Sequence, residues 1–369
     1  MMINEQRLLE RFLRYVQIDS PTREEGDFAR ILMAEMQELG LEVEMDGAGE
    51  VVGSNSGNLI GRLNGQLDRD PILFSSHMDT VSPGRGIKPV IKDGTIYSDG
   101  TTILGADNKA GIAALMEAFA VLKETSAPHG DVEVAFTIFE EGGLFGSKNL
   151  DYTRLKAKKG FVLDSGGDPG DIIIAGPAQA KIDVTFTGLE AHAGVAPETG
   201  ISAIMIAADA ISRMKLLRID EETTANIGSI EGKGPTNIVT KEVRIQAEAR
   251  SLSDEKLKAQ TDHMAECCYE AARKFNGKAD VVIAPAYGAF SIPEDHALVS
   301  ELKAVFAQMG IQAKTARSGG GSDTNVFNAN GIPSVNLAIG ERKPHTLEEH
   351  LHIRDLNTTA ELVLRLMQG

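Results

Sequence analysis

Short apolar runs alternate with helical patterns from about residue 70 onwards. PILFSS (71–76), VEVAFTIF (132–139) and GFVL (160–163) have the length and composition of buried strands. Between the first two lies KAGIAALMEAFAVLKE (109–124), whose apolar positions recur at helical spacing. Strands that alternate with helices in this way predict an α/β fold built on a mostly parallel sheet.

The pattern changes over residues 178–289. It predicts a strand at 180–187, a helix at 201–215, strands at 225–232 and 243–250, a helix at 253–275 and a strand at 279–285. This β-α-β-β-α-β order is the ferredoxin-like arrangement of an α+β domain. Because the α/β pattern resumes afterwards, we expect a discontinuous catalytic domain (1–177 and 290–369) that carries an inserted domain (178–289).

The composition narrows the classes of function. The chain has 37 Lys and Arg against 53 Asp and Glu, a net charge of −16, which disfavours nucleic acid and anionic membrane surfaces as partners. No apolar stretch is long enough to span a bilayer, and the first 20 residues lack the apolar core of a signal peptide. The only cysteines, Cys267 and Cys268, are neighbours on one predicted helix and do not suit a structural disulfide. We therefore expect a cytoplasmic protein.

Residues that can bind divalent metals follow the predicted strands. In an open parallel sheet, ligands bind beyond the carboxyl ends of the strands. The residues placed there, or at the start of the helix near residue 109, are His77, Asp79, Asp107, Glu140, Glu141, Asp164 and His345. So many carboxylates at one edge would be costly without cations. Because imidazole and carboxylate are metal ligands, the sequence predicts a dinuclear metal site.

Glu140 and Glu141 are expected to have different roles. The chain turns at Gly142 and Gly143, so both glutamates can face the site. One can bind metal while the other stays free as a general base. Asp79, two residues after His77, is placed to accept the second N–H of the imidazole.

Several motifs then occur in one order along the chain: SHMDTVSPG, YSDGTTILGADNKAGIAAL, FEEGG, VLDSGG and PHTLEEH. In this order and spacing they resemble the co-catalytic dizinc exopeptidases, a family that includes peptidase T, carboxypeptidase G and aminoacylase. The resemblance covers essentially the whole chain, and SDGTTILGADNKAG is most similar to peptidase T and its shorter peptidase T-like relatives. Asn108, where peptidase T commonly has aspartate, and AHAGVAPETG (191–200) depart from peptidase T, so its tripeptide specificity transfers less well than its zinc chemistry.

The resemblance implies a metal-binding role for five residues. His77 and Asp164 would hold one metal, Glu141 and His345 would hold the other, and Asp107 would bridge the two. The metals implied are two Zn²⁺ ions, with Co²⁺ or Mn²⁺ as alternatives.

Five further roles follow from the same resemblance. Glu140 would be the general base for a water activated by the metal pair, and Asp79 would orient the first metal-binding histidine. His192 would stabilise the developing oxyanion, from the same or the partner subunit. Asn237 and Arg250 match positions that hold a substrate carboxylate.

Two assignments stay open in the last part of the chain. His350 and His352 lie close enough to His345 in sequence to replace it as a ligand, although the Pro-His-Thr context favours His345. The glycine-rich SGGGSDTN (318–325) is expected to line the active-site wall, with Ser322 and Asp323 as weak substrate contacts.

Three functions are compatible with these features. The first is a zinc-dependent exopeptidase of the tripeptide aminopeptidase type that acts on short peptides. The second is an N-acyl-amino-acid deacylase or carboxypeptidase that uses the same dizinc site. The third is a binding protein without activity, which would require a damaged site, whereas every ligand and the base are present. The outer sheet edge of the inserted domain is a candidate surface for homodimer formation.

Overall fold

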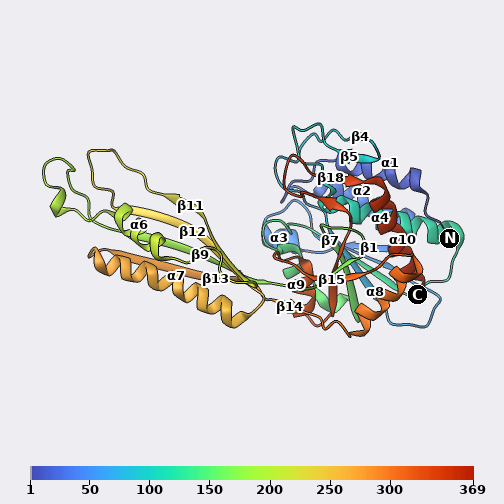
Figure 1. Cartoon of the computed structure of the whole chain (residues 1–369). Coiled ribbons are helices and arrows are strands. Elements are labelled where there is room, and N and C mark those ends of the chain that lie inside the picture. The colour runs from blue at the N-terminus through green and yellow to red at the C-terminus, as the bar shows by residue number, and fades with distance from the viewer. Residues whose placement is uncertain (1) are drawn as a thin grey trace. The chain divides into compact units, whose positions relative to one another are not determined.

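The computed structural model describes residues 2–369 and divides the chain into two compact units (Figure 1). Unit 1 comprises Met1–Ala175, Ser291–Arg317 and Ser322–Gly369, and unit 2 comprises Gly176–Phe290 and Ser318–Gly321. The sequence placed the limits at 177/178 and 289/290 and assigned the loop 318–321 to the first domain. That loop instead belongs to unit 2, where Gly321 approaches Tyr287 so closely that a Cβ would lie 2.3 Å from the ring.

Unit 1 contains a nine-stranded sheet in the order β1-β2-β6-β3-β7-β16-β8-β14, with β15 paired to β8. The four central strands β6, β3, β7 and β16 are parallel, whereas β1 and β2 add an antiparallel edge. The expected mostly parallel sheet is thereby confirmed. The strands are β1 (Glu42–Met45), β2 (Leu59–Leu63), β3 (Ile72–His77), β6 (Val132–Thr137), β7 (Lys159–Ser165), β8 (Asp171–Gly176), β14 (Phe290–Ser291), β15 (Lys314–Arg317) and β16 (Ser334–Ala338).

Helix α4 (Ala106–Thr125) is the central helix of unit 1. It packs against β3 and β7 on one side and against α1 and α10 on the other (Figure 1). Small residues permit this burial, since a Cβ at Gly111 would lie 2.5 Å from Ser76 Oγ. The remaining helices of unit 1 are α1 (Glu5–Val16), α2 (Gly26–Glu38), α3 (Ala48–Val52), α5 (Phe145–Lys148), the 3₁₀ turn η1 (Tyr152–Arg154), α8 (Ala297–Gln308), α9 (Asp323–Ala329) and α10 (Ile353–Gln368).

A small second sheet of unit 1 has the order β17-β18-β5-β4. Its strands are β4 (Val90–Lys92), β5 (Thr95–Tyr97), β17 (Glu341–Arg342) and β18 (His350–His352). The pairing of β18 with β5 fixes both ends of the loop 343–349, which carries His345. The sequence did not predict this sheet, because strands of two or three residues give no periodic signal.

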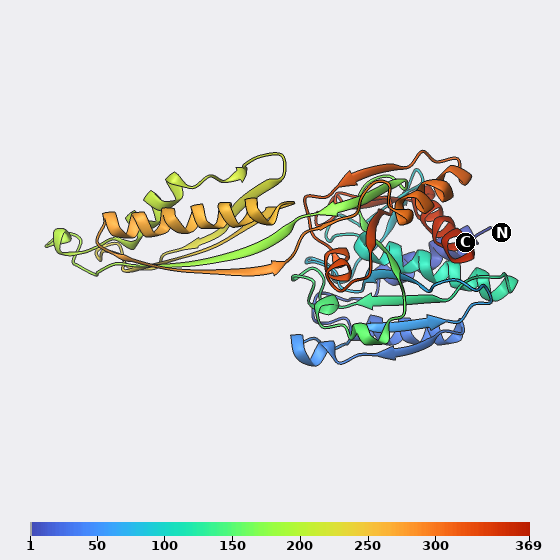
Figure 2. The same ribbon diagram turned by 90° about the horizontal axis from the view of Figure 1, so that it is seen from below.

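Unit 2 is an antiparallel sheet in the order β10-β11-β12-β9-β13, with α6 and α7 packed on one face (Figures 1 and 2). Along β9, buried Ile182 and Val184 alternate with exposed Lys181 and Asp183, as expected for a sheet covered on one side. The elements are β9 (Ala178–Thr187), η2 (Pro197–Thr199), α6 (Ala203–Arg213), β10 (Leu217–Arg218), β11 (Thr223–Glu231), β12 (Glu242–Ser251), α7 (Asp254–Lys274) and β13 (Lys278–Tyr287). The ferredoxin-like prediction is confirmed, with β10 as an addition.

Within residues 2–369, no helix has both the length and the apolar character needed to cross a membrane.

Candidate metal centre

The five candidate metal ligands come from five segments of unit 1. His77 is the last residue of β3, Asp164 lies in β7, and Glu141 follows β6. Asp107 stands at the start of α4 with non-helical φ −78° and ψ 102°, so the regular helix begins only after it. His345 lies between β17 and β18 with φ +63°. Parallel strand order brings the first three to one edge of the sheet.

The carboxylate of Asp107 contacts both histidines. Its Oδ1 lies 2.8 Å from His77 Nε2, and its Oδ2 lies 3.1 Å from His345 Nε2. His77 Nε2 is also 3.2 Å from Asp164 Oδ1, and His345 Nε2 is 3.0 Å from Glu141 Oε1. The five residues therefore form two groups that share Asp107.

Electrostatics of the site reflect the crowding of buried acids. Burial, together with Asp164 and Asp107, raises the pKa of Glu140 and Glu141 above the ordinary glutamate value. Burial also raises the pKa of Asp164 to about 7. For His77 burial acts in the opposite direction, but neighbouring carboxylates outweigh it and raise the pKa well above its usual value. Hydrogen bonds to Asp107 and Glu141 raise the pKa of His345 to about 10.

The donor set fits a divalent metal. One ligand atom from each of His77, Asp107 and Glu141 lies within 4.8 Å of the others. Imidazole nitrogens and carboxylate oxygens are the usual ligands of zinc, and a bridging carboxylate is the usual centre of a two-metal site. The pKa values of both histidines are raised by the neighbouring carboxylates, and imidazole must be neutral to bind a metal, so metal binding would release protons.

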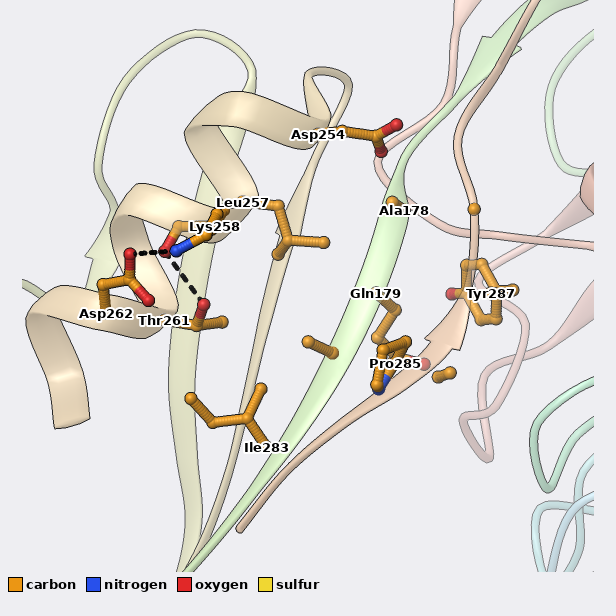
Figure 3. A pocket seen from close by; sticks show the side chains of 13 residues that line it. Ala178, Gln179, Asp254, Leu257, Lys258, Thr261, Asp262, Ile283, Pro285 and Tyr287 are labelled. Atoms are coloured by element: carbon orange, nitrogen blue, oxygen red, sulfur yellow. Dashed lines mark hydrogen bonds and ion pairs between the residues drawn. The ribbon is translucent and has the colours of Figure 1, made fainter. Parts of the chain in front are cut away.

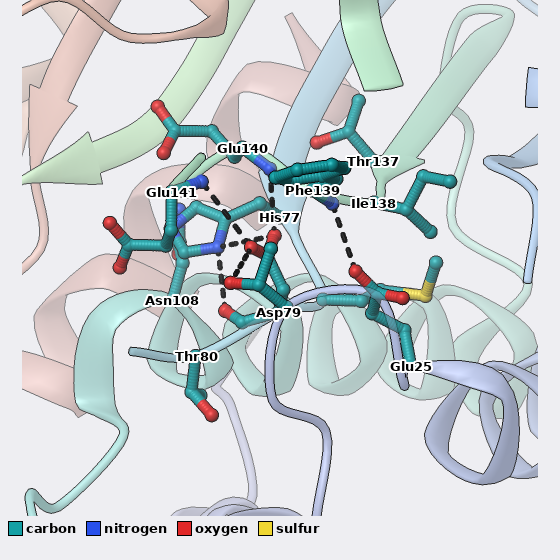
Figure 4. Close-up of polar contacts among 12 residues, drawn as sticks. Glu25, His77, Asp79, Thr80, Asn108, Thr137, Ile138, Phe139, Glu140 and Glu141 are labelled. Atoms are coloured by element: carbon teal, nitrogen blue, oxygen red, sulfur yellow. Dashed lines mark hydrogen bonds and ion pairs between the residues drawn. The ribbon is translucent and has the colours of Figure 1, made fainter. Parts of the chain in front are cut away.

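Two buried carboxylates hold the turn that carries Glu140 and Glu141 (Figure 4). The N–H of Phe139 donates to Glu25 Oε1 at 3.0 Å. The N–H of Glu140 donates to Asp79 Oδ1 at 2.9 Å, and that of Glu141 to Asp79 Oδ2 at 3.3 Å. Both glutamate side chains leave the turn toward the same side, as Figure 4 shows. Hydrogen bonds from three consecutive backbone amides to these two carboxylates thus hold the two adjacent glutamates in place.

The role of Asp79 is broader than expected. His77 Nδ1 lies 2.8 Å from the backbone oxygen of Asp79 but 3.5 Å from its carboxylate. The carboxylate instead accepts its shortest hydrogen bonds from the amide of Glu140 at 2.9 Å and from Thr22 Oγ1 at 2.8 Å. Asp79 therefore contacts the imidazole mainly through its main chain and the Glu140 turn through its side chain.

Two further ligand segments are held by side chains that the sequence did not single out. Glu349 is buried and accepts the N–H groups of Leu104, Gly105 and Asp107 at 2.8, 2.9 and 3.1 Å. Asn336 accepts the N–H of Asp164 at 3.0 Å and donates to its backbone oxygen at 2.8 Å. No local pattern could have revealed either residue, because the partners are 172 to 245 positions apart in sequence.

Asn108 contacts a candidate metal ligand directly. Its Nδ2 donates to Asp164 Oδ1 at 2.7 Å, and the residue is fully buried. An aspartate at this position would place a carboxylate against a carboxylate. The amide therefore lowers the negative charge around Asp164.

The remaining predicted site residues belong to unit 2. His192 is paired with Ile238 through an antiparallel bridge, and Ala193 N–H donates to the backbone oxygen of Asn237 at 2.9 Å. Arg250 lies in β12 and donates through Nε to Glu248 Oε1 at 2.8 Å. His192 and Asn237 are thus neighbours, while Arg250 lies near the other end of β12.

The expected substrate contacts at Ser322 and Asp323 are wrong. Ser322 is the N-cap of α9, and Asp323 is 2% exposed and accepts hydrogen bonds from Thr137 and Ser147. Ser322 therefore supports the start of α9, and Asp323 supports the fold around the end of β6. As for the alternative ligands, His350 stacks on Tyr97 and His352 lies 2.8 Å from Thr95 Oγ1, so the geometry favours His345.

Several known proteins are similar to this chain over its whole length. The model of the peptidase family M20/M25/M40 matches residues 73–369. The uncharacterised protein YqjE of Bacillus subtilis (strain 168) is 49% identical over all of this chain and 99% of its own. The solved structure of aminopeptidase PepT from Bacillus cereus ATCC 10987 is 48% identical with a TM-score of 0.91, and that of a tripeptidase from Staphylococcus aureus is 44% identical with a TM-score of 0.96. Each covers 100% of this chain and 99% of the other.

Proposed function

Because the chain belongs to peptidase family M20/M25/M40 and is a peptide hydrolase, we propose that it is a dizinc aminopeptidase of the tripeptidase type that acts on short peptides. The similarity to structures named PepT and tripeptidase, at 48% and 44% identity over the full chain, supports this narrower activity. Co²⁺ or Mn²⁺ are the alternatives to Zn²⁺, since the same nitrogen and oxygen ligands suit them.

One observation carries the proposal. The two oxygens of Asp107 face two different histidines, at 2.8 and 3.1 Å, and each histidine also contacts a second carboxylate. Thus His77 and Asp164 would hold one ion, His345 and Glu141 would hold the other, and Asp107 would bind both. When bound, the ions supply Lewis-acid chemistry that polarises the scissile carbonyl and lowers the pKa of water.

Glu140 is the proposed general base. It would take a proton from the water that attacks the carbonyl carbon and return that proton to the leaving amine nitrogen as the C–N bond breaks. Burial raises the pKa of Glu140, which brings the carboxyl closer to the range in which it can both accept and donate at neutral pH. The carboxylate of Asp79 would hold Glu140 in place by accepting the backbone N–H of Glu140.

His192 is the proposed donor to the oxyanion that develops on the attacked carbonyl. A typical oxyanion-hole donor contributes about 3–4 kcal/mol to transition-state stabilisation. His192 and Asn237 lie on adjacent segments of unit 2 and would act together. Asn237 precedes β12, which begins at Glu242, and Arg250 lies eight residues into that strand, about 26 Å further along. Arg250 and Asn237 of one copy therefore cannot bind the same carboxylate.

The test compares a free tripeptide with its N-acetylated form, using protein stripped of metal and reloaded with Zn²⁺, Co²⁺ or Mn²⁺. The proposal expects release of the amino-terminal residue from the free tripeptide and loss of turnover on acetylation. Equal cleavage of the acetylated substrate would favour the N-acyl-amino-acid deacylase or carboxypeptidase. Failure to bind metal or to hydrolyse either substrate would leave a binding protein as the better interpretation.

We further propose that the chain forms a homodimer through the open edge of unit 2. The edge strand β13 exposes Val282 and Ile283. Beside it lies a largely apolar pocket of about 460 Å³ between β13 and α7, lined in part by Leu257, Ile283 and Pro285 (Figure 3). An exposed apolar edge strand favours pairing with another strand. Light scattering should give the mass of two chains for the wild type and one chain for Val282→Lys.

A dimer would allow His192 to act on the partner's metal centre. Mixing inactive Glu140→Ala and His192→Ala variants tests this directly, because a mixed dimer would combine one intact centre with one intact His192 from the other chain. Recovery of activity would establish action in trans, and no recovery from confirmed mixed dimers would establish action in cis.

We also propose a cytoplasmic location. Cys267 and Cys268 are both free and buried in unit 2, which is compatible with a reducing compartment. Fractionation of cells that express the protein from its own gene, with detection by antibody, is the measurement that checks this.

A further inference from the structure

The segment Pro21–Glu25 contacts the turn of the general base from outside the metal centre. The N–H of Thr22 donates to the backbone oxygen of Thr80 at 3.3 Å, and Thr22 Oγ1 donates to Asp79 Oδ2 at 2.8 Å. The guanidinium carbon of Arg23 lies 4.7 Å from the centre of the Phe139 ring. The segment therefore contacts both Phe139, which leads into the Glu140 turn, and Asp79, whose carboxylate holds that turn.

Glu25 is the centre of this contact. Its side chain accepts three hydrogen bonds from three separate segments: the N–H of Arg23 at 2.9 Å, the N–H of Phe139 at 3.0 Å, and Ser54 Oγ at 2.6 Å. The residue has no exposed surface. The hydrogen bonds from Arg23 and Ser54 therefore fix the orientation of the carboxylate that accepts the Phe139 amide.

The charge of Glu25 is unusual for a purely structural residue. Within residues 2–369, no lysine, arginine or histidine forms an ion pair with it, and burial followed by the negative charge of Asp79 raises its pKa. A buried carboxylate without a cation costs stability unless its hydrogen bonds compensate. Here the compensating donors include the amide that precedes Glu140.

The turn itself needs this support. Phe139 has φ +48°, a conformation that is unfavourable for an aromatic residue. The same residue links β6 to Glu140, so its backbone sets the direction in which both glutamates leave the strand. Loss of the Phe139 hydrogen bond would let the turn relax toward an ordinary backbone conformation.

We propose that Glu25 is a positioning residue for catalysis, which acts through the Phe139 amide to hold Glu140 and Glu141 at the metal centre. The expected effect on turnover rests on the proposed function, whereas the expected effect on the structure of the turn does not. Glu25 completes a set in which Asp79 holds the two following amides.

A matched control exists at the other end of β6. Glu133 is 3% exposed and also accepts consecutive amides, those of Lys156 and Ala157, each at 2.8 Å. It precedes Glu140 by seven residues, about 23 Å of extended chain. Glu133→Ala therefore removes hydrogen bonds of the same kind, together with an ion pair to Arg62 at 3.7 Å, without touching the catalytic turn.

The kinetic test uses full-length protein reloaded with Zn²⁺ and an unblocked tripeptide. Glu25→Ala should lower kcat about 10- to 100-fold, the usual effect of removing a residue that supports a metal ligand, with KM changed by less than about 3-fold. Glu25→Gln retains an acceptor for the Phe139 amide and should recover most of the lost kcat. Glu133→Ala should keep the wild-type kcat. Equal losses in Glu25→Ala and Glu133→Ala would overturn the proposal.

Hydrogen exchange of the metal-free protein gives a readout that does not depend on activity. The peptide covering residues 138–145 should exchange faster in Glu25→Ala than in the wild type and unchanged in Glu133→Ala. Unchanged exchange in Glu25→Ala would overturn the proposal even if activity fell. If Glu25→Ala does not fold, Ser54→Ala, which frees Glu25 Oε2, should give the same faster exchange, and wild-type exchange there would count against the proposal. An inactive wild type would refute the proposed function, while the exchange data would still decide the role of Glu25.

Discussion

Replacing Glu349 by glutamine removes a buried acid that holds the segment before α4. Glu349 Oε2 accepts the amides of Leu104 and Gly105, and Oε1 accepts the amide of Asp107. Glutamine has the same shape but offers only one oxygen, so its NH₂ group must face at least one N–H donor. The substitution therefore weakens the hold on Asp107, the proposed bridging ligand, and removes one titrating group.

The titration gives a magnitude with a definite sign. Burial raises the pKa of Glu349 from 4.5 to about 7 in the folded protein, although its three amide hydrogen bonds act in the opposite direction. Because the folded pKa is raised, the stability contributed by this group is present below pH 4.5 and is lost as pH rises through 7. Between pH 5 and pH 8 the loss amounts to about 2–3 kcal/mol. Glutamine does not titrate and shows no such loss.

The assay is urea unfolding of metal-free protein at pH 5 and pH 8. The chain has no tryptophan, so far-ultraviolet circular dichroism is the suitable probe. The free energy of unfolding of the wild type minus that of Glu349→Gln should fall by about 2–3 kcal/mol from pH 5 to pH 8. Glu133→Gln controls for the loss of a buried carboxylate that accepts amides elsewhere. A difference that stays constant or grows with pH would refute the reasoning.

Three shorter predictions concern the metal centre and its supports. Glu140→Gln should keep two metal ions per chain by elemental analysis but lose about 10²- to 10⁴-fold in kcat, whereas Asp107→Asn should lose metal; equal metal loss would show that the base is misassigned. Zinc binding at pH 7 should release protons, since the pKa of His345 is about 10 without metal; calorimetry in buffers of different ionisation enthalpy measures this, and no release would contradict it. Asn336→Ala should lower the free energy of unfolding by about 2–4 kcal/mol, because it leaves the buried N–H and C=O of Asp164 unpaired; a urea-measured loss below about 0.5 kcal/mol would contradict this.

The sequence predicted the features that depend on local pattern. The parallel strands and the ferredoxin-like unit follow from apolar periodicity, and both are present. The candidate ligands could be gathered on one edge because parallel strand ends converge there by geometry. The short strands β4, β5, β17 and β18 gave no signal, since two or three residues carry no periodicity and the pairing of β18 with β5 joins segments about 250 residues apart.

The supporting residues could not be found in the same way. Glu25 stands in the charged stretch TREEGD, which reads as a solvent-exposed turn before a helix. Its burial depends on Ser54 and Phe139, which the fold brings to it from two other segments. The glycine-rich context of Asp323 pointed to a loop wall, although the residue is buried against Thr137 and Ser147. Such roles are properties of tertiary contact, which periodicity does not encode.

The choice of carboxylates as backbone supports links the fold to the metals. Glu25, Asp79 and Glu349 together accept seven backbone amides, and each adds negative charge beside a centre that is already acidic. An amide side chain would lack that charge but has only one acceptor oxygen, whereas Asp79 and Glu349 each use both carboxylate oxygens. The carboxylates therefore deepen the negative potential that attracts divalent cations and that raises the pKa of the nearby acids.

This arrangement makes the metal-free protein sensitive to alkali. The folded pKa of Asp164 is raised to about 7 and that of His345 to about 10, so the stability that each provides is lost as pH rises through those values. Metal affinity instead increases as pH rises, because the ligands must lose protons before they bind the ions. Removal of metal by a chelator should therefore lower the melting temperature more at pH 8 than at pH 5. A smaller effect at pH 8 would mean that the buried acids are not neutralised by the ions that the geometry predicts.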